Sequence, residues 1–457
     1  MAGIAFQLRR LSQSTTYAGK LGAYASAAVI SAGPWMISIV ALMLLTYLLH
    51  QKLDGDTIRL FNACVTHDYA IALILTGPIQ LLLTRYVADQ LSVNEPHHIF
   101  PSFCGGLIVT TLIAGAVGCA FFLGMVEGPS WELRAAAATL LVYVSCIFVA
   151  NVYLSVLRAY QKIVFAFFTG YGVGVAAAWH LATDYGVTGA MIGLLIGHLL
   201  LFLILAWNIR RELGQGRGSP FRFLRAAVQM PDLLWIGLFY NLGIWIDKVL
   251  FWWNSQSRIE VAGVLHAAPD YDLAIYLSLL SIVPGMTVFI LEVETSFAEK
   301  FQHYHDAVNH GKSLTLIREA KKAIILSLRT GFLRLLKVQG IATLILVASA
   351  GELTRWFHVS FIQLGIFRIT LFGAFMLMAF LAMLTVLFYF NDRRGALICT
   401  AVFLVANGLL SALTILQNEA WYGFGFVVAS SVALLIAAVR VNARLDDLEY
   451  YTFNPEL

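Results

Sequence analysis

The chain has 457 residues, of which 60% are hydrophobic and 12% are charged, and its mean hydropathy is +0.78. Soluble domains carry about 25% charged residues, so this composition excludes a soluble enzyme or binding domain and indicates a polytopic membrane protein. The net charge of +4 does not indicate nucleic-acid binding, because the basic residues lie in short segments between apolar stretches, as membrane topology requires.

Twelve stretches of the chain meet the requirement for a transmembrane helix, which is about 20 mostly apolar residues. The predicted spans cover residues 22–49, 61–89, 99–125, 135–158, 164–183, 186–209, 233–254, 272–298, 335–351, 363–390, 395–417 and 421–440. A basic linker at residues 210–232 leaves six spans on each side. The sequence therefore predicts an all-α membrane protein with an N-terminal six-helix bundle, residues 1–209, and a C-terminal six-helix bundle, residues 233–457.

The Lys and Arg residues predict the orientation of the chain in the membrane. If the N-terminus lies inside the cell, most of these residues fall in segments on the inner side. Positive charges favour the cytoplasmic side of a membrane. We therefore expect both termini of this multi-pass protein to face the cytoplasm.

The longest connection, residues 301–337, lies on the predicted cytoplasmic side within the C-terminal bundle. Its apolar and basic residues take opposite faces at helical spacing, which is typical of a helix on an anionic membrane surface. The apolar positions are Leu314, Ile317, Ile324, Ile325 and Leu328, and the basic positions are Arg318, Lys321, Lys322 and Arg329. This segment is either an interfacial linker that joins the halves or a docking surface for a cytoplasmic partner.

Spans 2 and 8 occupy corresponding places in the two halves, and each has a Pro/Gly pair near its centre, Gly77-Pro78 and Pro284-Gly285. A proline removes one backbone hydrogen bond from a helix, and broken helices at matching positions of two repeats indicate a binding site between them. Gly33-Pro34-Trp35 in span 1 is echoed by Gly243-Ile244-Trp245 in span 7. The candidate hinge residues are Gly33, Pro34, Pro78, Pro284 and Gly285.

An outer layer of charge is expected from spans 2 and 7. Asp247 and Lys248 of span 7 lie near the depth expected for His67 and Asp68 of span 2. A charge in a span costs at least ~2.5 to 3.5 kcal/mol on insertion scales unless it faces a cavity or a partner. Asp68 can pair with Lys248 or Asp247, or Lys248 can pair with Asp247 in its own helix.

An inner layer is expected nearer the cytoplasm. Arg85 of span 2 shares this depth with Glu292 and Glu294 of span 8, so Arg85 can pair with Glu292. Pairs in the two layers either gate a transport cycle or only brace the helices, and Arg85 or Glu294 can instead extend to the interface.

Uncharged residues give further candidates for a cavity. Tyr240 and Trp245 of span 7 offer aromatic faces on which sugar rings stack. The amides of Asn241 and Asn151 can bond sugar hydroxyls, although amides in spans also bond across helices. His198 of span 6 is expected to be a packing residue.

Enzymatic motifs are scarce. The P-loop, HExxH, GxSxG and CxxC patterns do not occur. Asp54-Gly55-Asp56 in the first outer loop matches the short acidic pattern of some glycosyltransferases, but Asp-Gly is also a turn signal, which is the preferred interpretation. The five cysteines lie in apolar spans without metal-ligand spacing. The sequence therefore predicts no enzymatic activity, no cofactor and no metal site.

Three blocks of the sequence, Met1–Leu11 (MAGIAFQLRRL), Ile30–Trp35 (ISAGPW) and Leu82–Asp89 (LLTRYVAD), resemble the inner-membrane transporter of the Pel exopolysaccharide system, the PelG-type family. The resemblance covers the whole chain and implies membership of the multidrug/oligosaccharidyl-lipid/polysaccharide flippase superfamily. In that superfamily two six-helix bundles surround a central cavity, lined largely by spans 1, 2, 7 and 8. The resemblance implies no catalytic motif in this chain.

The resemblance also implies a function. The protein would move a nascent polysaccharide of N-acetylgalactosamine type across the bacterial inner membrane. Its implied partners are the polysaccharide chain, a cytoplasmic glycosyltransferase and membrane subunits, one of which senses cyclic di-GMP. The alternatives are a flippase for a lipid-linked oligosaccharide or a drug-like amphipathic molecule, a membrane glycosyltransferase or ligase, and a scaffolding subunit of the synthase.

Overall fold

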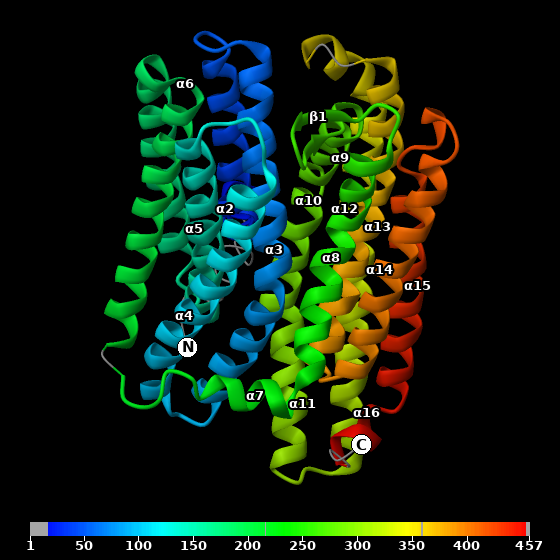
Figure 1. The fold of residues 1–457 in the computed structure, drawn as a ribbon. Coiled ribbons are helices and arrows are strands. Elements are labelled where there is room, and N and C mark those ends of the chain that lie inside the picture. Colours follow the sequence, from blue (N-terminus) through cyan, green and yellow to red (C-terminus); the bar gives the residue numbers. More distant parts are fainter. Residues whose placement is uncertain (1–16, 215, 358–359, 454–457) are drawn as a thin grey trace. The chain divides into compact units, whose positions relative to one another are not determined.

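The computed structural model describes residues 17–214, 216–357 and 360–453, and its regular structure is almost entirely helical (Figure 1). By packing, the chain divides into two compact units. The N-terminal unit comprises residues 33–269, and the C-terminal unit comprises residues 270–457 with the residues up to Ala32. This division keeps the helix at residues 231–254 with the N-terminal unit, so it differs from the expected boundary at residues 210–232, and the two-bundle boundary stays a prediction.

The elements as far as residue 267 are helices and one short hairpin. In chain order they are α2 (Tyr17–Leu49), α3 (Gly55–Ser92), the 3₁₀ turn η1 (Pro96–His98), α4 (Ile99–Gly118), the π-helix η2 (Cys119–Met125), α5 (Trp131–Val156), α6 (Tyr160–Leu213), α7 (Phe223–Gln229), α8 (Pro231–Asn254), and the antiparallel strands β1 (Ile259–Ala262) and β2 (Leu265–Ala267).

The elements from residue 269 onwards are helical. In chain order they are α9 (Pro269–Leu280), α10 (Val283–Glu292), the π-helix η3 (Val293–Phe297), α11 (Ala298–Asn309), α12 (Leu314–Phe357), α13 (Phe361–Tyr389), α14 (Arg393–Ile415), the 3₁₀ turn η4 (Glu419–Trp421), α15 (Phe424–Asp446) and α16 (Leu448–Phe453).

Eleven segments of the described chain are long and apolar enough to cross a membrane. One of them, α6, has 54 residues, or about 80 Å of helix, which is more than twice the hydrocarbon thickness of a bilayer. Its backbone breaks at Gly186, where φ is 55° and ψ is −139°. Helix α6 therefore supplies two spans, and the predicted total of twelve is confirmed.

Small residues hold the two arms of α6 against each other. An added Cβ on Gly193 would lie 2.2 Å from the backbone nitrogen of Ala178, and one on Gly197 would lie 2.5 Å from the Cα of Gly174. The spacing of four residues along each arm is the small-xxx-small pattern of membrane helix pairs. Through this contact the second arm of α6 packs against the first within the N-terminal unit.

Only one of the two expected helix breaks is present. Helix α3 continues without interruption through Pro78, so the expected break in span 2 is wrong. A proline there removes a single hydrogen bond from a helix that packs against α5 and α8. Span 8 does break, because α9 ends at Leu280 and α10 begins at Val283.

The break in span 8 is satisfied by one side chain of α12. The Gly285 N–H donates to Oε1 of Gln339 at 2.9 Å, and Nε2 of Gln339 donates to the Ser281 carbonyl at 2.8 Å. Gln339 is fully buried. Membrane proteins tolerate broken helices where a neighbour forms hydrogen bonds with the freed backbone groups. The Gln339 amide does so with one backbone N–H and one backbone carbonyl.

Helix α12 corrects a second expectation. The basic segment was expected to form a separate helix on the membrane surface, but residues 314–357 form one helix of 44 residues that also contains span 9. A turn at Gly311, with φ of 61°, reverses the chain after α11, and α12 packs back against α11. Ile317 and Ile324 are buried while Leu314 is 52% exposed, so protein covers only part of the apolar face of the segment.

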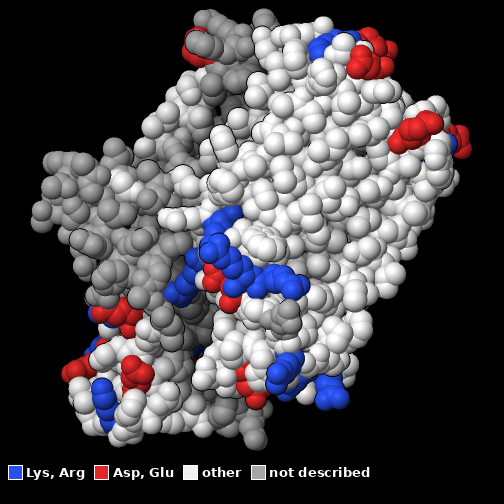
Figure 2. Space-filling view, turned by 90° about the vertical axis from the view of Figure 1, so that its left-hand side faces the viewer, with Lys and Arg blue, Asp and Glu red and all other residues white. Residues whose placement is uncertain are grey.

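Charged side chains avoid part of the surface. On the face in Figure 2, they lie along the upper rim and from about the middle of the view downwards, and the described surface between these regions shows neither blue nor red residues. Such a band suits the hydrocarbon interior of a bilayer, where charges are costly. The described helices and this surface are those of a multi-pass membrane protein.

We predict that Gln339→Leu destabilises the protein. The substitution leaves the buried Gly285 N–H and Ser281 carbonyl without a partner, and each unsatisfied group costs about 1 to 3 kcal/mol. Thermal unfolding of the detergent-purified protein should show a lower midpoint than the wild type. Gln302→Leu changes an exposed glutamine on α11 and is the control; equal midpoints for the two variants would contradict this account.

Candidate functional site

Helices α3 and α8 cross with their backbones in contact. An added Cβ on Gly77 would lie 2.6 Å from the Gly237 carbonyl oxygen, and one on Gly237 would lie 2.4 Å from the Gly77 carbonyl oxygen. Asn241 donates to the Gly237 carbonyl at 2.8 Å and lies against Gly77 in the same crossing. This candidate cavity amide is therefore part of the helix contact.

The crossing sets the level of the polar residues in the two helices. Along α3, His67 lies ten residues before Gly77, and along α8, Asp247 lies ten residues after Gly237. Each separation is about 15 Å, and the two helices run in opposite directions. The His67 ring stacks on Trp252 with 4.4 Å between centroids. His67 of span 2 and Trp252 of span 7 therefore meet within the N-terminal unit, while the common depth in the membrane stays a prediction.

Asp68 is fully buried, and neither carboxylate oxygen has a hydrogen-bond partner among the described residues. His67 next to it donates from Nδ1 to the Ala63 carbonyl at 2.9 Å, while its buried Nε2 has no partner within the described chain. Burying an ionised carboxylate without a partner costs several kcal/mol. No hydrogen bond within the described chain therefore offsets the free-energy cost of burying the Asp68 carboxyl group.

Lys248 pairs with Asp247. Its Nζ lies 3.1 Å from Oδ1 of Asp247 and donates to the Ile244 carbonyl at 2.8 Å. The Trp245 ring lies 5.7 Å from the same nitrogen, and Trp245 is 8% exposed. Of the pairings left open by the sequence, the one within a single helix is present, and no hydrogen bond or ion pair joins Asp68 to Lys248 in the described structure.

The residues of the expected inner layer have other partners. Arg85 pairs with Asp89 of its own helix at 3.0 Å, and both are exposed. Glu292 pairs with Arg334 of α12. The Glu294 side chain lies outside the described residues. A pair between Arg85 and Glu292 stays a prediction.

A pocket of ≈ 390 Å³ opens between α3 and α5, within the N-terminal unit. Its lining is uncharged: Gln80, Thr84, Phe148, Asn151, Val152, Ser155 and Val156. The Asn151 Oδ1 atom is buried and has no hydrogen-bond partner in the described chain. Amides and hydroxyls beside one aromatic ring provide the donors, acceptors and apolar face that bind a neutral polyhydroxy ligand.

Of the four candidate cavity residues, only Asn151 lines this pocket, and Tyr240, Trp245 and Asn241 do not. Gln80, Thr84 and Ser155 were missed. A signal for Gln80 and Thr84 was present in span 2, where Thr76, Gln80 and Thr84 follow each other at intervals of four residues. Gln80 donates to the Thr76 hydroxyl at 2.7 Å, so this polar stripe begins as a connected pair.

Two further polar residues have ordinary structural roles. His198 shares a hydrogen bond of 2.8 Å with the Tyr69 hydroxyl and bonds the Leu194 carbonyl through Nδ1, which supports its assignment as a packing residue. Asp54 caps α3 by accepting from the Thr57 N–H at 3.1 Å, and hydrogen bonds from Thr57 lower the pKa of this exposed carboxyl. Asp56 pairs with Arg59. The acidic pattern in this loop is therefore a helix start.

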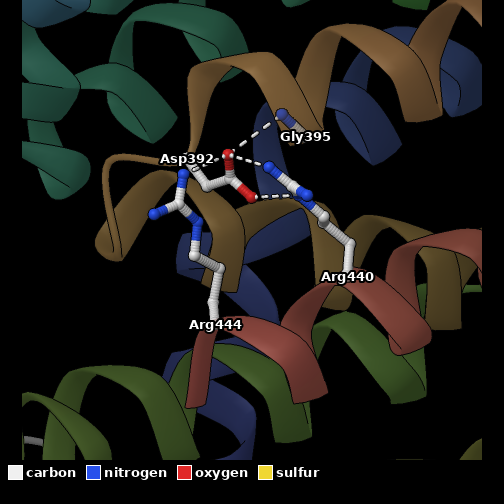
Figure 3. Close-up of polar contacts among 4 residues, drawn as sticks. All are labelled: Asp392, Gly395, Arg440 and Arg444. Carbon is white, nitrogen blue, oxygen red and sulfur yellow. Dashed lines mark hydrogen bonds and ion pairs between the residues drawn. The ribbon is translucent and has the colours of Figure 1, made fainter. Parts of the chain in front are cut away.

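The C-terminal unit contains a charge cluster that the sequence did not reveal (Figure 3). Asp392, which caps α14, is fully buried and binds Nε of Arg440 at 2.7 Å and Nη2 of Arg444 at 2.9 Å. The Gly395 N–H donates to the same carboxylate at 3.0 Å. Arg444 also lies 3.7 Å from the Tyr451 ring centre. The cluster thereby connects the start of α14 to α15 and α16.

Burial alone would raise the pKa of Asp392, but hydrogen bonds from Arg444, Arg440 and the Gly395 N–H outweigh it and lower the pKa to about 2. The ordinary pKa is 3.8. Because the folded pKa is the lower one, the unfolded chain binds the proton first as pH falls. The stabilisation is complete above the ordinary pKa and is lost as pH falls through about 4 towards 2.

We predict that Asp392→Asn lowers the free energy of unfolding by about 2 kcal/mol at pH 7, because the depressed pKa corresponds to that much stabilisation. The difference from the wild type should shrink between pH 5 and pH 3. Thermal unfolding in detergent across this range measures both effects. Asp447→Asn removes an exposed carboxylate and is the control; a deficit at Asp392→Asn that does not change with pH would refute the ion-pair account.

The chain matches the PelG family, described as "Putative exopolysaccharide Exporter (EPS-E)", over residues 1–453. No curated protein matches it. Solved transporters have a similar fold. A MOP-superfamily transporter from Pyrococcus furiosus is 13% identical, with 97% of this chain and 98% of that chain covered and a TM-score of 0.64.

Two further structures agree in fold. An outward-facing MATE-family transporter of the MOP superfamily is 13% identical, covers 97% of this chain and 99% of its own, and has a TM-score of 0.65. A mutant form of the Vibrio cholerae MATE transporter VcmN is 13% identical, covers 97% and 98%, and has a TM-score of 0.62. Both family and fold are those of transporters. The chain belongs to the PelG family of exopolysaccharide exporters and has the fold of a MOP-superfamily transporter.

Proposed function

We propose that the protein translocates a nascent Pel-type exopolysaccharide, rich in N-acetylgalactosamine, across the bacterial inner membrane, and that the pocket between α3 and α5 contacts the sugar chain. The uncharged polar lining of this pocket carries the proposal. A neutral polymer that slides through a protein needs many replaceable hydrogen bonds and no fixed charge that would hold it. The lining of Gln80, Thr84, Asn151 and Ser155 meets this need.

The protein has no enzymatic role in this proposal. A cytoplasmic glycosyltransferase builds the polymer, and membrane subunits, including one that senses cyclic di-GMP, complete the synthase. The described chain supports this division in one respect, because Asp54 and Asp56 are engaged in capping and pairing at the start of α3. Reconstitution tests the proposal: glycosyltransferase and sugar nucleotide are supplied on one side of the membrane, and polymer is sought on the other.

The buried charges of α3 and α8 form the gate in this proposal. Asp68 and Asp247 compete for Lys248, which binds Asp247 in the present state and moves to Asp68 in another. Asp68 is the next residue to His67, which stacks on Trp252, and Lys248 is one helical turn from Trp252. The exchange requires the Lys248 side chain to turn from Asp247 of its own helix towards Asp68 of α3.

We predict that Asn151→Leu lowers secreted polymer by about tenfold relative to the amount of protein in the membrane. The substitution keeps the branching at Cγ and removes the amide, and the loss of a hydrogen bond of about 1.4 kcal/mol corresponds to a tenfold change. The matched control is Asn208→Leu, which removes an amide of α6 outside the pocket. Equal secretion by the two variants would exclude the pocket from the path. Accumulation of a lipid-linked saccharide in a deletion strain would favour a flippase.

We predict that Asp68→Asn abolishes secretion while membrane abundance stays at the wild-type level, because an amide fills the same space but has no negative charge to attract the Lys248 ammonium. Lys248→Met should also abolish secretion. Ser145→Ala, which removes a buried hydroxyl that has no partner among the described residues, should secrete normally. Normal polymer from Asp68→Asn would eliminate the exchange mechanism.

A further inference from the structure

The turn between α3 and α4 gathers three metal-ligating side chains. Glu95, His97 and His98 each offer one ligand atom, and these atoms lie within 4.8 Å of one another. The local sequence causes the convergence, since Pro96 starts a 3₁₀ turn after Asn94, whose φ is 59°. Residues three apart in a 3₁₀ turn lie one above the other, which places His98 over Glu95.

One distance in the turn is close to the separation of two ligand atoms on a bound zinc ion. Nε2 of His98 lies 3.6 Å from Oε2 of Glu95. Zn–N and Zn–O bonds of about 2.0 to 2.2 Å in a tetrahedral site separate two ligand atoms by about 3.4 Å. His97 is exposed, so its ring can rotate to shorten the remaining separations. We propose that Glu95, His97 and His98 bind a divalent transition-metal ion, with Zn²⁺ as the expected species.

Polar atoms around this turn lack partners. Within the described chain, Nδ1 of His98, the Tyr86 hydroxyl and Oε1 of Gln90 are buried and make no hydrogen bond. Buried polar atoms in native proteins are nearly always bonded, and a bound ion or water accounts for many of the exceptions. Two imidazoles and a carboxylate are, in addition, the ligand set of many zinc sites that keep a position for water.

Arg222 competes with the metal for Glu95. Its Nη1 lies 3.8 Å from Oε2 of Glu95, and both side chains are more than two-fifths exposed. A cation bound to Glu95 repels this guanidinium, which is free to turn into solvent. Arg222 therefore limits the metal affinity of the site, and removal of its side chain should raise this affinity.

The metal would act on the linker that leads to α7 and α8. The Arg217 N–H donates to the His97 carbonyl at 2.8 Å. An added Cβ on Gly218 would lie 2.6 Å from Nδ1 of His98, so the linker rests directly on the histidine pair. An ion that fixes both histidines fixes the surface that supports the linker. Zinc is thereby coupled to the segment preceding the helix that carries Asp247 and Lys248.

The test is Zn²⁺ binding to the full chain in detergent, measured by calorimetry and by metal content after dialysis. We expect one equivalent in the wild type, at least tenfold weaker binding in His97→Ala and His98→Ala, and tighter binding in Arg222→Ala. His303→Ala, which removes an exposed histidine of α11, should bind as the wild type. Trypsin cleavage after the exposed Arg217 should slow with Zn²⁺ in the wild type and in His303→Ala but not in His98→Ala.

Wild-type affinity in the double variant His97→Ala, His98→Ala would overturn the proposal, as would the absence of a zinc equivalent in the wild type. Binding that is unchanged or weaker in Arg222→Ala would overturn the competition at Glu95. Because trypsin cleavage is compared between variants at the same zinc concentration, an effect of zinc on the protease itself changes all of them equally. None of these readouts depends on polymer export, so they fail or succeed independently of the proposed transport function.

Discussion

The backbone contact between Gly77 of α3 and Gly237 of α8 fixes the polar chemistry of the N-terminal unit. Because neither glycine has room for a Cβ, the two helices have one register. That register places His67 against Trp252 and Asp68 on the level of Lys248. Three residues beyond Gly77 lies Gln80, which belongs to the polar stripe of α3 and lines the pocket next to α5. One close approach of two backbones thus supports both the buried charges and the uncharged pocket.

Hydropathy predicted the twelve spans because the bilayer demands a minimum length of apolar helix, and that demand is visible in a single sequence. The break in span 8 was also predictable from Pro284. What the sequence could not reveal is how a break is satisfied: Gln339 lies 54 residues from Gly285 along the chain and meets it only through packing. Helix α3 stays intact at Pro78, although the proline alone suggested a break.

Pairing of charges was less predictable than their depth. Sequence position gives the level of a residue along a helix, but not the direction of its side chain, and Lys248 points to its neighbour Asp247. Asp392 was missed because it lies between spans and only folding brings Arg440 and Arg444 to it. The expectation of no metal site rested on cysteine spacing and did not consider the histidines after Pro96, on which the zinc proposal rests. Glu-Pro-His-His in a short turn was a readable signal.

The contrast between the two buried aspartates bears on which part of the protein can change state. Asp392 accepts hydrogen bonds from two arginines and a backbone N–H, and so has one strongly preferred arrangement. Asp68 accepts none in the described chain. A carboxylate with all its partners resists change, because every alternative leaves a buried charge uncompensated. A carboxyl with no partner gains from any change that brings a cation or a proton to it, and this asymmetry is what a gating residue requires.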